Sequence, residues 1–394
     1  MSEFPLADLK VLDLSQWISG PFCTKLLADF GAEVIKIENP KGGDPLRRFG
    51  PFPGETSDPE KSGLFLYLNT NKKSITLNLK SEAGVKIFKQ LVQEADVVVE
   101  NFEPGFMAGL GLDYETLQEL RPSLILTSIS YFGQNGPYRD YKGADIVAQA
   151  LGGIMSLTGL PEREPLKIAG PQAEYQAGLN AAVATLTALY FRDETGLGQH
   201  IDVAVMEVMA SILEGALLSY AYNKVTRKRA GARHPLVYPS TILPCRDGYV
   251  HVHAGTDWET FAYFLNLPQL LNYQPEEARQ KAEEIDALLK PWLQERGKEE
   301  IFHQAQEWRF PFAMVLKPEQ LLEDPQFQER KFFVQTEHPI AGQVIYPGAP
   351  FKLSEGGWRA GRAPLLGEHN EEIYCHRLGY TGQDLVRLKE EGII

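Results

Sequence analysis

The first forty residues alternate between strand-like and helix-like patterns, and this alternation constrains the fold more than any other feature. Residues 10–14 (KVLDL) form a short apolar run typical of a strand, and residues 32–38 (AEVIKIE) alternate like a second strand. Between them, residues 22–30 carry apolar side chains at helical spacing, with Pro21 suited to a helix's first turn and Gly31 to its left-handed end. A strand, a helix and a strand within about 30 residues form a βαβ unit, which implies a parallel strand pair and a right-handed crossover.

Further elements alternate in the same way up to about residue 150, and long apolar helices follow them. The expected elements are helices at 81–94, 114–120, 146–157, 174–191 and 201–222 and strands at 96–100 and 124–130. Short apolar strands that alternate with helices are typical of an α/β fold built on a parallel sheet.

The pattern changes after residue 225, which predicts a smaller, separate domain over residues 225–320. It contains an antiparallel strand at 248–253 (GYVHVH) and a charged, amphipathic helical region at 275–308. Strand patterns return at 344–346 and 351–353, and a polar C-terminal helix follows them.

Charge and cysteine content exclude several classes of protein. The chain has 52 acidic and 39 basic residues and a formal charge of −13, whereas a nucleic-acid binder needs a basic surface. No uncharged apolar run reaches the roughly 18 residues of a membrane span, and the first ten residues lack the pattern of an export signal. Cys23, Cys245 and Cys375 are widely spaced, which is typical of reduced thiols rather than metal ligands. We therefore expect a soluble, cytoplasmic protein that binds neither nucleic acid nor membrane.

Ligands of an open parallel sheet bind beyond the carboxyl ends of its strands. Three segments there, 15–20, 101–105 and 131–145, are rich in glycine and small polar residues. The sequence contains no dinucleotide-binding, P-loop, zinc-protease or hydrolase-elbow motif. His251 and His253 share one face of a strand, but no third ligand is evident, so we expect no metal site. The residues alone predict an α/β enzyme that binds a small molecule.

Long motifs in a fixed order give a more specific prediction. They are VLDLSQWISGPFCTKLLADFGAEVIKIENPKGGDPLR (11–47), NTNKKSITLNLK (69–80), ADVVVENFEPG (95–105), GADIVAQALGGIMSLTG (143–159), TGLGQHIDVAVMEV (195–208), DPQFQERKFF (324–333), GAPFKLS (348–354) and RAPLLGEH (362–369). In these motifs the chain resembles the class III CoA-transferases, the CaiB/BaiF family of formyl-CoA and crotonobetainyl-CoA transferases.

The resemblance implies a Rossmann-like large domain built from both chain ends, an inserted smaller α+β domain, and two chains interlocked as a dimer. The large domain would comprise residues 1–200 and 330–394, and the small domain residues 225–320. Residues 201–224 and 321–329 would be linkers.

The resemblance also implies covalent catalysis by a carboxylate. In the family, an Asp attacks the acyl-CoA thioester to give a mixed anhydride, and the CoA thiolate then forms an enzyme thioester. The incoming acid reverses the exchange. Here the Asp position falls on Glu174, within AGPQAEYQAG (169–178). Its side chain is longer by one C–C bond, about 1.5 Å. Glu174 is therefore either a nucleophile in a reshaped pocket or a residue with no covalent role.

Further positions of the CoA site carry over from the family motifs. They are Gln16 and Ser19 after the first strand, Lys72 and Lys73 toward the CoA phosphates, Asn101 and Phe102 in ENFEPG, and Lys142 and Asp145 in YKGAD. The two adjacent lysines also fit an ordinary solvated turn. Many relatives carry an Arg where this chain has Gly109, so one expected CoA contact is missing.

The sequence thus predicts a CoA-transferase that moves CoA between a carboxylic acid and an acyl-CoA, with CoA as substrate and no bound cofactor. It would act as a homodimer or as one subunit of a heteromer of the benzylsuccinate CoA-transferase type. One alternative is a catalytically silent structural subunit of such a heteromer. Another is an α-methylacyl-CoA racemase, but the His that this branch needs is replaced by Ala144.

Overall fold

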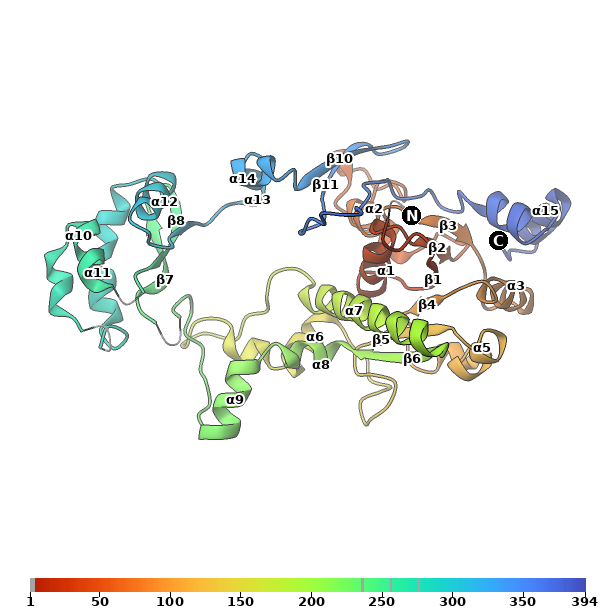
Figure 1. The fold of residues 1–394 in the computed structure, drawn as a ribbon, viewed down its shortest axis with the longest axis horizontal. Coiled ribbons are helices and arrows are strands. Elements are labelled where there is room, and N and C mark those ends of the chain that lie inside the picture. The colour runs from red at the N-terminus through yellow and green to blue at the C-terminus, as the bar shows by residue number, and fades with distance from the viewer. Residues whose placement is uncertain (1–3, 235–236, 256, 275–276) are drawn as a thin grey trace. The chain divides into compact units, whose positions relative to one another are not determined.

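The computed structural model describes residues 4–234, 237–255, 257–274 and 277–394 (Figure 1). The chain packs into two compact units. The first comprises residues 1–154, 168–214 and 329–394, and the second comprises residues 155–167 and 215–328. The first unit therefore draws on both ends of the chain.

The first unit is built on a six-stranded sheet in the order β3-β2-β1-β4-β5-β6, and every neighbouring pair is parallel. Its strands are β1 (Lys10–Asp13), β2 (Glu33–Glu38), β3 (Lys73–Thr76), β4 (Val97–Glu100), β5 (Ile125–Ser130) and β6 (Gln199–Ala204). The strand order reverses between β1 and β4, so the loops after these two strands diverge and leave a crevice at the carboxyl edge. The expected α/β, Rossmann-like fold is confirmed.

Helices cover both faces of this sheet, and the alternation of side chains along each strand supplies two cores. Val11 and Val99 face the core beneath α1 and α7, whereas Leu12 and Val98 face the core beneath α3 and α5. The helices of this unit are α1 (Ser19–Asp29), α2 (Gly63–Leu68), α3 (Glu82–Val92), α4 (Phe106–Gly109), α5 (Tyr114–Leu120), α6 (Asp145–Leu151), α7 (Gln172–Thr195), α8 (Val205–Ser211) and α15 (Gly382–Glu390).

Small residues let α7 lie directly against α1. Ala173, Ala177 and Ala181 are completely buried in the core beneath these helices. A Cβ atom on Gly178 would collide with the backbone oxygen of Ser19, so only glycine fits at this crossing. The contact holds the first turn of α7 beside the beginning of α1 (Figure 1).

Most expected elements of this unit are present, and three predictions are wrong. The helix expected at 146–157 is not continuous, because α6 ends at Leu151 and residues 154–157 form a separate 3-10 turn after Gly153, whose φ is 88°. The opening βαβ unit is confirmed, although its helix begins at Ser19. Residues 201–222 are not one helix, because residues 199–204 pair with β5 as the edge strand β6, followed by α8 and then α9 (Glu214–Asn223). Residues 351–353 are not a strand; the antiparallel hairpin of β10 (Phe333–His338) and β11 (Gly342–Pro347) ends before them.

The second unit has its own core beside a three-stranded antiparallel sheet, β7-β8-β9. Its remaining elements are β7 (Ser240–Cys245), β8 (Gly248–His253), β9 (Ala313–Met314), α10 (Trp258–Leu265), α11 (Ala282–Gln294), α12 (Lys298–Glu307), α13 (Pro318–Leu321) and α14 (Pro325–Glu329). The strand expected at 248–253 is confirmed. The helical region expected at 275–308 resolves into α11 and α12, while residues 275–276 lie outside the described residues.

Among the described residues, no single helix combines the length and apolar character that crossing a membrane requires. One bent pair, α8 with residues 215–223, meets the criteria by length and composition only.

The crossing of α1 and α7 generates a stability prediction. Gly178→Ala should lower the free energy of unfolding by about 1–3 kcal/mol, because the added methyl group forces the two backbones apart. The matched control is Gly109→Ala at the end of α4, where an added Cβ atom would meet nothing within 4 Å. Urea denaturation followed by circular dichroism measures both variants; equal stability of the two would contradict the close contact.

Candidate active site

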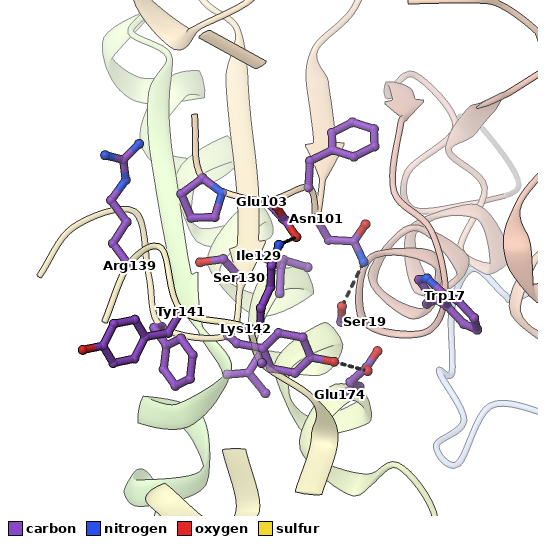
Figure 2. A pocket seen from close by; sticks show the side chains of 16 residues that line it. Trp17, Ser19, Asn101, Glu103, Ile129, Ser130, Arg139, Tyr141, Lys142 and Glu174 are labelled. Carbon is purple, nitrogen blue, oxygen red and sulfur yellow. Dashed lines mark hydrogen bonds and ion pairs between the residues drawn. The ribbon is translucent and has the colours of Figure 1, made fainter. Parts of the chain in front are cut away.

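A cleft of about 290 Å³ opens at the carboxyl edge of the parallel sheet. Loops after β1, β4 and β5 line it, together with the first turn of α7 (Figure 2). Five of the residues expected in the CoA and catalytic site line this cleft: Ser19, Asn101, Phe102, Lys142 and Glu174. The parallel sheet thus brings together segments that are far apart in the sequence.

The loop after β1 is fixed by the buried carboxylate of Asp13. This carboxylate accepts a hydrogen bond of 3.0 Å from the Ser15 amide, and it lies 2.9 Å from the Lys72 ammonium. Burial alone would raise the pKa of Asp13, but Lys36 and Lys72 outweigh this effect and hold the pKa below its ordinary value. Asp13 therefore stays ionised and keeps the loop in one conformation.

The two adjacent lysines have partners inside the protein. Lys72 is buried, and its ammonium also donates to the hydroxyl of Thr24 at 2.7 Å, so it is not part of a solvated turn. Burial lowers the pKa of Lys72 to about 8, although the carboxylate of Asp13 opposes the change. Lys73 forms ion pairs with Glu33 at 2.8 Å and Glu372 at 2.7 Å. Neither lysine lines the cleft, and their contact with CoA phosphates stays a prediction.

Asn101 joins the loops after β1 and β4. Its side-chain oxygen accepts the Gln16 amide at 2.8 Å, and its Nδ2 donates to the Gln16 carbonyl at 2.7 Å and to the Ser19 hydroxyl at 3.3 Å. Gln16 itself does not line the cleft, and the neighbouring Phe102 does. Asn101 therefore sets the width of the crevice between these two strands.

Glu174 lies half-buried in the first turn of α7. Its Oε1 accepts a hydrogen bond of 2.6 Å from the hydroxyl of Tyr131, which follows β5. Asp145 does not line the cleft; its Oδ1 accepts the amides of Ala173 at 2.8 Å and Glu174 at 3.3 Å, and so caps this turn. Burial raises the pKa of Glu174, while the Tyr131 hydroxyl and the Ser19 amide favour its ionised form. Hydrogen-bond donors thus orient this carboxylate.

The segment after β5 supplies the basic side chains of the cleft. Lys142 forms an ion pair with Glu103. Arg139 Nε lies 3.7 Å from Asp140 Oδ1, and it has no hydrogen-bond partner among the described residues. Figure 2 shows Arg139 and Glu174 on opposite sides of the cleft. The Glu174 carboxylate and the Arg139 guanidinium therefore lie on opposite sides of the cleft, while the Lys142 ammonium is paired with Glu103, which also lines the cleft.

The sequence does not identify Tyr131 or Arg139 as site residues. It predicts only that their segment, 131–145, lies at the ligand-binding edge, because of its glycines and its place after a strand. That signal identifies the loop, but the direction of each side chain depends on where the loop folds back.

A buried carboxylate lies beneath the cleft at the end of β4. Glu100 accepts the Phe102 amide at 2.7 Å, and it is hydrogen-bonded to Ser128, whose hydroxyl lies 2.9 Å from His200 Nε2. Burial raises the pKa of Glu100 to about 7, and the hydrogen bonds only partly oppose this effect. Glu100 therefore titrates near neutral pH.

The two histidines considered as metal ligands lie on β8 of the second unit. The rings of His251 and His253 stack with centroids 6.1 Å apart. In the part of the chain that the structure describes, no group of three or more His, Cys, Asp or Glu side chains is arranged to hold a metal ion.

Comparison with known proteins identifies relatives along nearly the whole chain. The family model described as CoA-transferase family III matches residues 6–370. The chain is 35% identical to the succinyl-CoA–D-citramalate CoA-transferase of Chloroflexus aurantiacus, over 99% of this chain and 98% of that protein. It is 32% identical to the succinyl-CoA–L-malate CoA-transferase alpha subunit of the same species, over 100% and 93% respectively. The crystal structure of a CAIB/BAIF family protein from Brucella suis is 32% identical and superposes with a TM-score of 0.87, covering 95% of this chain and 100% of that one.

The raised pKa of Glu100 generates a prediction on pH. A folded-state pKa near 7 means that unfolding releases a proton between about pH 4.5 and 7, so this residue makes the protein less stable as pH rises through that window. Glu100→Gln should remove this contribution. As pH rises from about 5 to about 8, the free energy of unfolding of the variant should increase by on the order of 2–3 kcal/mol relative to that of the unchanged protein.

Urea denaturation at several pH values measures this difference. Glu119→Gln, which removes the same charge from an exposed position on α5, is the control. Parallel pH profiles for the unchanged protein and Glu100→Gln would contradict the prediction.

Proposed function

The chain belongs to CoA-transferase family III, and from this premise we propose which of its residues carry out the transfer. The protein is a transferase that moves CoA between an acyl-CoA and a carboxylic acid. We propose that both substrates react in the cleft at the carboxyl edge of the sheet and that Glu174 is the nucleophile. The position of the Glu174 carboxylate, inside the cleft and hydrogen-bonded to Tyr131 at 2.6 Å, is the observation that carries this proposal.

In the proposed reaction, a carboxylate oxygen of Glu174 attacks the thioester carbonyl, the C–S bond breaks and CoA leaves as a thiolate. The thiolate then attacks the Glu174 carbonyl of the mixed anhydride, releases the first acid and leaves a thioester on Glu174. The second acid repeats the two exchanges in reverse. A half-buried carboxylate suits this role because its raised pKa makes it more basic, while the Tyr131 hydroxyl and the Ser19 amide favour its ionised form.

The charges of the cleft support one orientation of the substrate. The thioester would lie at Glu174, and the anionic phosphate end of CoA would lie toward Arg139 and Lys142 (Figure 2). Asn101 and Phe102 would border the chain between these ends. This chain has Gly109 where many relatives carry an Arg. Arg139 would supply a cation for the CoA phosphates in its place.

The names of two relatives support a substrate class. Both of those proteins are named for succinyl-CoA as donor and a hydroxy dicarboxylic acid as acceptor. We propose that this chain likewise takes succinyl-CoA and a small dicarboxylic acid.

We propose that the active form is an assembly of at least two chains, a homodimer or a heteromer with a homologous subunit. Large apolar side chains along α7 support it, since Leu179, Val183 and Tyr190 are 44%, 57% and 72% exposed. The words "alpha subunit" in one relative's name support the heteromer. The division into a CoA-binding domain (1–200 and 330–394) and a small domain (225–320), and a cytoplasmic location, remain proposals.

A second candidate function is that of a silent subunit in a heteromeric transferase. The observation that favours it is the Glu at position 174, because a shift of about 1 Å in a reacting group costs on the order of 10²-fold in rate. Trapping the covalent intermediate separates the two functions.

Hydroxylamine should trap the intermediate on Glu174. After incubation with succinyl-CoA, the peptide that contains Glu174 should gain the mass of a hydroxamate, since hydroxylamine cleaves both anhydrides and thioesters. Glu174→Gln should abolish both the adduct and the exchange of CoA between acids. Glu194→Gln, at the exposed far end of the same helix, is the matched control and should behave like the unchanged protein. Full activity of Glu174→Gln would establish the silent subunit instead.

Replacing Arg139 should weaken the binding of succinyl-CoA but not the binding of a substrate that lacks the CoA phosphates. Arg139→Ala should raise the KM for succinyl-CoA by roughly 10-fold or more, because charge-assisted hydrogen bonds to phosphate are lost. The KM for succinyl-pantetheine should stay unchanged. Arg387→Ala on α15, an exposed arginine outside the cleft, is the control. An equal effect on both substrates would contradict the proposed orientation.

A further inference from the structure

Tyr131 is the side chain that holds the proposed nucleophile. Its hydroxyl donates to Glu174 Oε1 at 2.6 Å, and both residues line the cleft; the dashed line that ends at Glu174 in Figure 2 marks this hydrogen bond. The residue immediately follows β5, and its carbonyl oxygen accepts the Met206 amide at 3.1 Å, so its backbone is fixed at both sides. Burial and the neighbouring carboxylate raise the pKa of Tyr131 well above its ordinary value. The hydroxyl therefore keeps its proton and acts as a hydrogen-bond donor.

The loop after β5 is shaped to keep the ring of Tyr131 in this place. A Cβ atom on Gly143 would collide with the Tyr131 ring, so the loop returns past the ring only because residue 143 is glycine. Two residues later, Asp145 caps the turn that carries Glu174. The donor and the carboxylate are thus positioned by the same loop, one through its ring and the other through the helix cap.

The length of the side chain at position 174 explains why this contact is specific to a glutamate. An aspartate side chain at position 174 would end about 1.5 Å earlier. A hydrogen bond that is 2.6 Å long with Glu174 would be lost over such a gap. The hydroxyl of Tyr131 therefore matches the longer acid.

We propose that Tyr131 is a catalytic residue that holds Glu174 Oε1 and then stabilises the oxyanion that forms on this atom. The inference rests on the proposed function of Glu174. With Oε1 held, Oε2 attacks the thioester: the Oε2–C bond forms, the C–S bond breaks, CoA leaves as a thiolate, and Oε1 becomes the carbonyl oxygen of the anhydride. When the thiolate attacks the Glu174 carbonyl carbon, negative charge develops on Oε1, which the Tyr131 hydroxyl already faces. No proton leaves Tyr131 in either step.

Tyr131→Phe tests this role. Loss of an oxyanion donor should lower kcat by roughly 10²- to 10³-fold and leave the KM for succinyl-CoA nearly unchanged. Because the hydroxyl favours the ionised form of Glu174, its removal should also raise the pKa of Glu174 and move the acidic limb of kcat/KM to higher pH. Tyr138→Phe, in the same loop but outside the cleft lining, is the matched control and should change neither quantity.

A double-mutant comparison isolates the contact. In the Glu174→Asp background, the shorter acid does not reach the hydroxyl, so Tyr131→Phe should have little further effect on kcat. If Tyr131→Phe does not fold, 3,5-difluorotyrosine at position 131 preserves the shape with a more acidic hydroxyl. It should move the acidic limb of kcat/KM to lower pH.

The outcomes separate the two proposals. If Tyr131→Phe changes neither kcat nor the acidic limb of kcat/KM, the role of Tyr131 is overturned. The same holds if fluorotyrosine does not move that limb. In either case, an inactive Glu174→Gln leaves the proposed function standing. Equal effects of Tyr131→Phe in the unchanged protein and in the Glu174→Asp background overturn it as well. An active Glu174→Gln without a hydroxamate adduct overturns the proposed function itself.

Discussion

The carboxylate of Asp13, buried at the end of β1, is the interaction on which the rest of the cleft depends. A buried charge costs free energy unless its lone pairs are satisfied, and here Lys72 lies 2.9 Å away and Thr24 donates at 2.7 Å. These partners come from the loop before β3 and from α1, so a single carboxylate ties three elements together. It thereby fixes the beginning of α1, whose Ser19 amide faces Glu174.

Three carboxylates at one edge of the sheet have different pKa values because their surroundings differ. Burial would raise the pKa of each, but of the three only Asp13 has two lysines that reverse the change. Glu100 is held by hydrogen-bond donors that only partly oppose its burial, and its pKa rises to about 7. Glu174 is oriented by a hydroxyl and by backbone amides that favour its ionised form, while burial raises its pKa and makes it more basic than an exposed glutamate. These environments suit one carboxylate to structure and another to covalent chemistry.

Helix α7 serves both the core and the cleft. Ala177 and Gly178 bring its backbone against α1, which places Glu174 in the crevice beside the switch point of the sheet. Its other side carries exposed apolar side chains such as Val183 and Tyr190. A helix that is apolar on both sides has no single core-facing stripe, and its sequence alone does not distinguish a buried face from an interface.

The sequence by itself determined the parallel sheet and the edge at which side chains gather, because both follow from local periodicity and from the geometry of βαβ units. These patterns predict that Ser19 and Asn101 lie near one another, whereas only the resemblance to the class III CoA-transferases adds Glu174 to them. Only the tertiary structure decided that residues 199–204 form an edge strand beside β5, that Lys72 is buried, and that Tyr131 reaches Glu174 across 43 positions of the chain. Each of these depends on pairing or packing between distant segments, which no local pattern records.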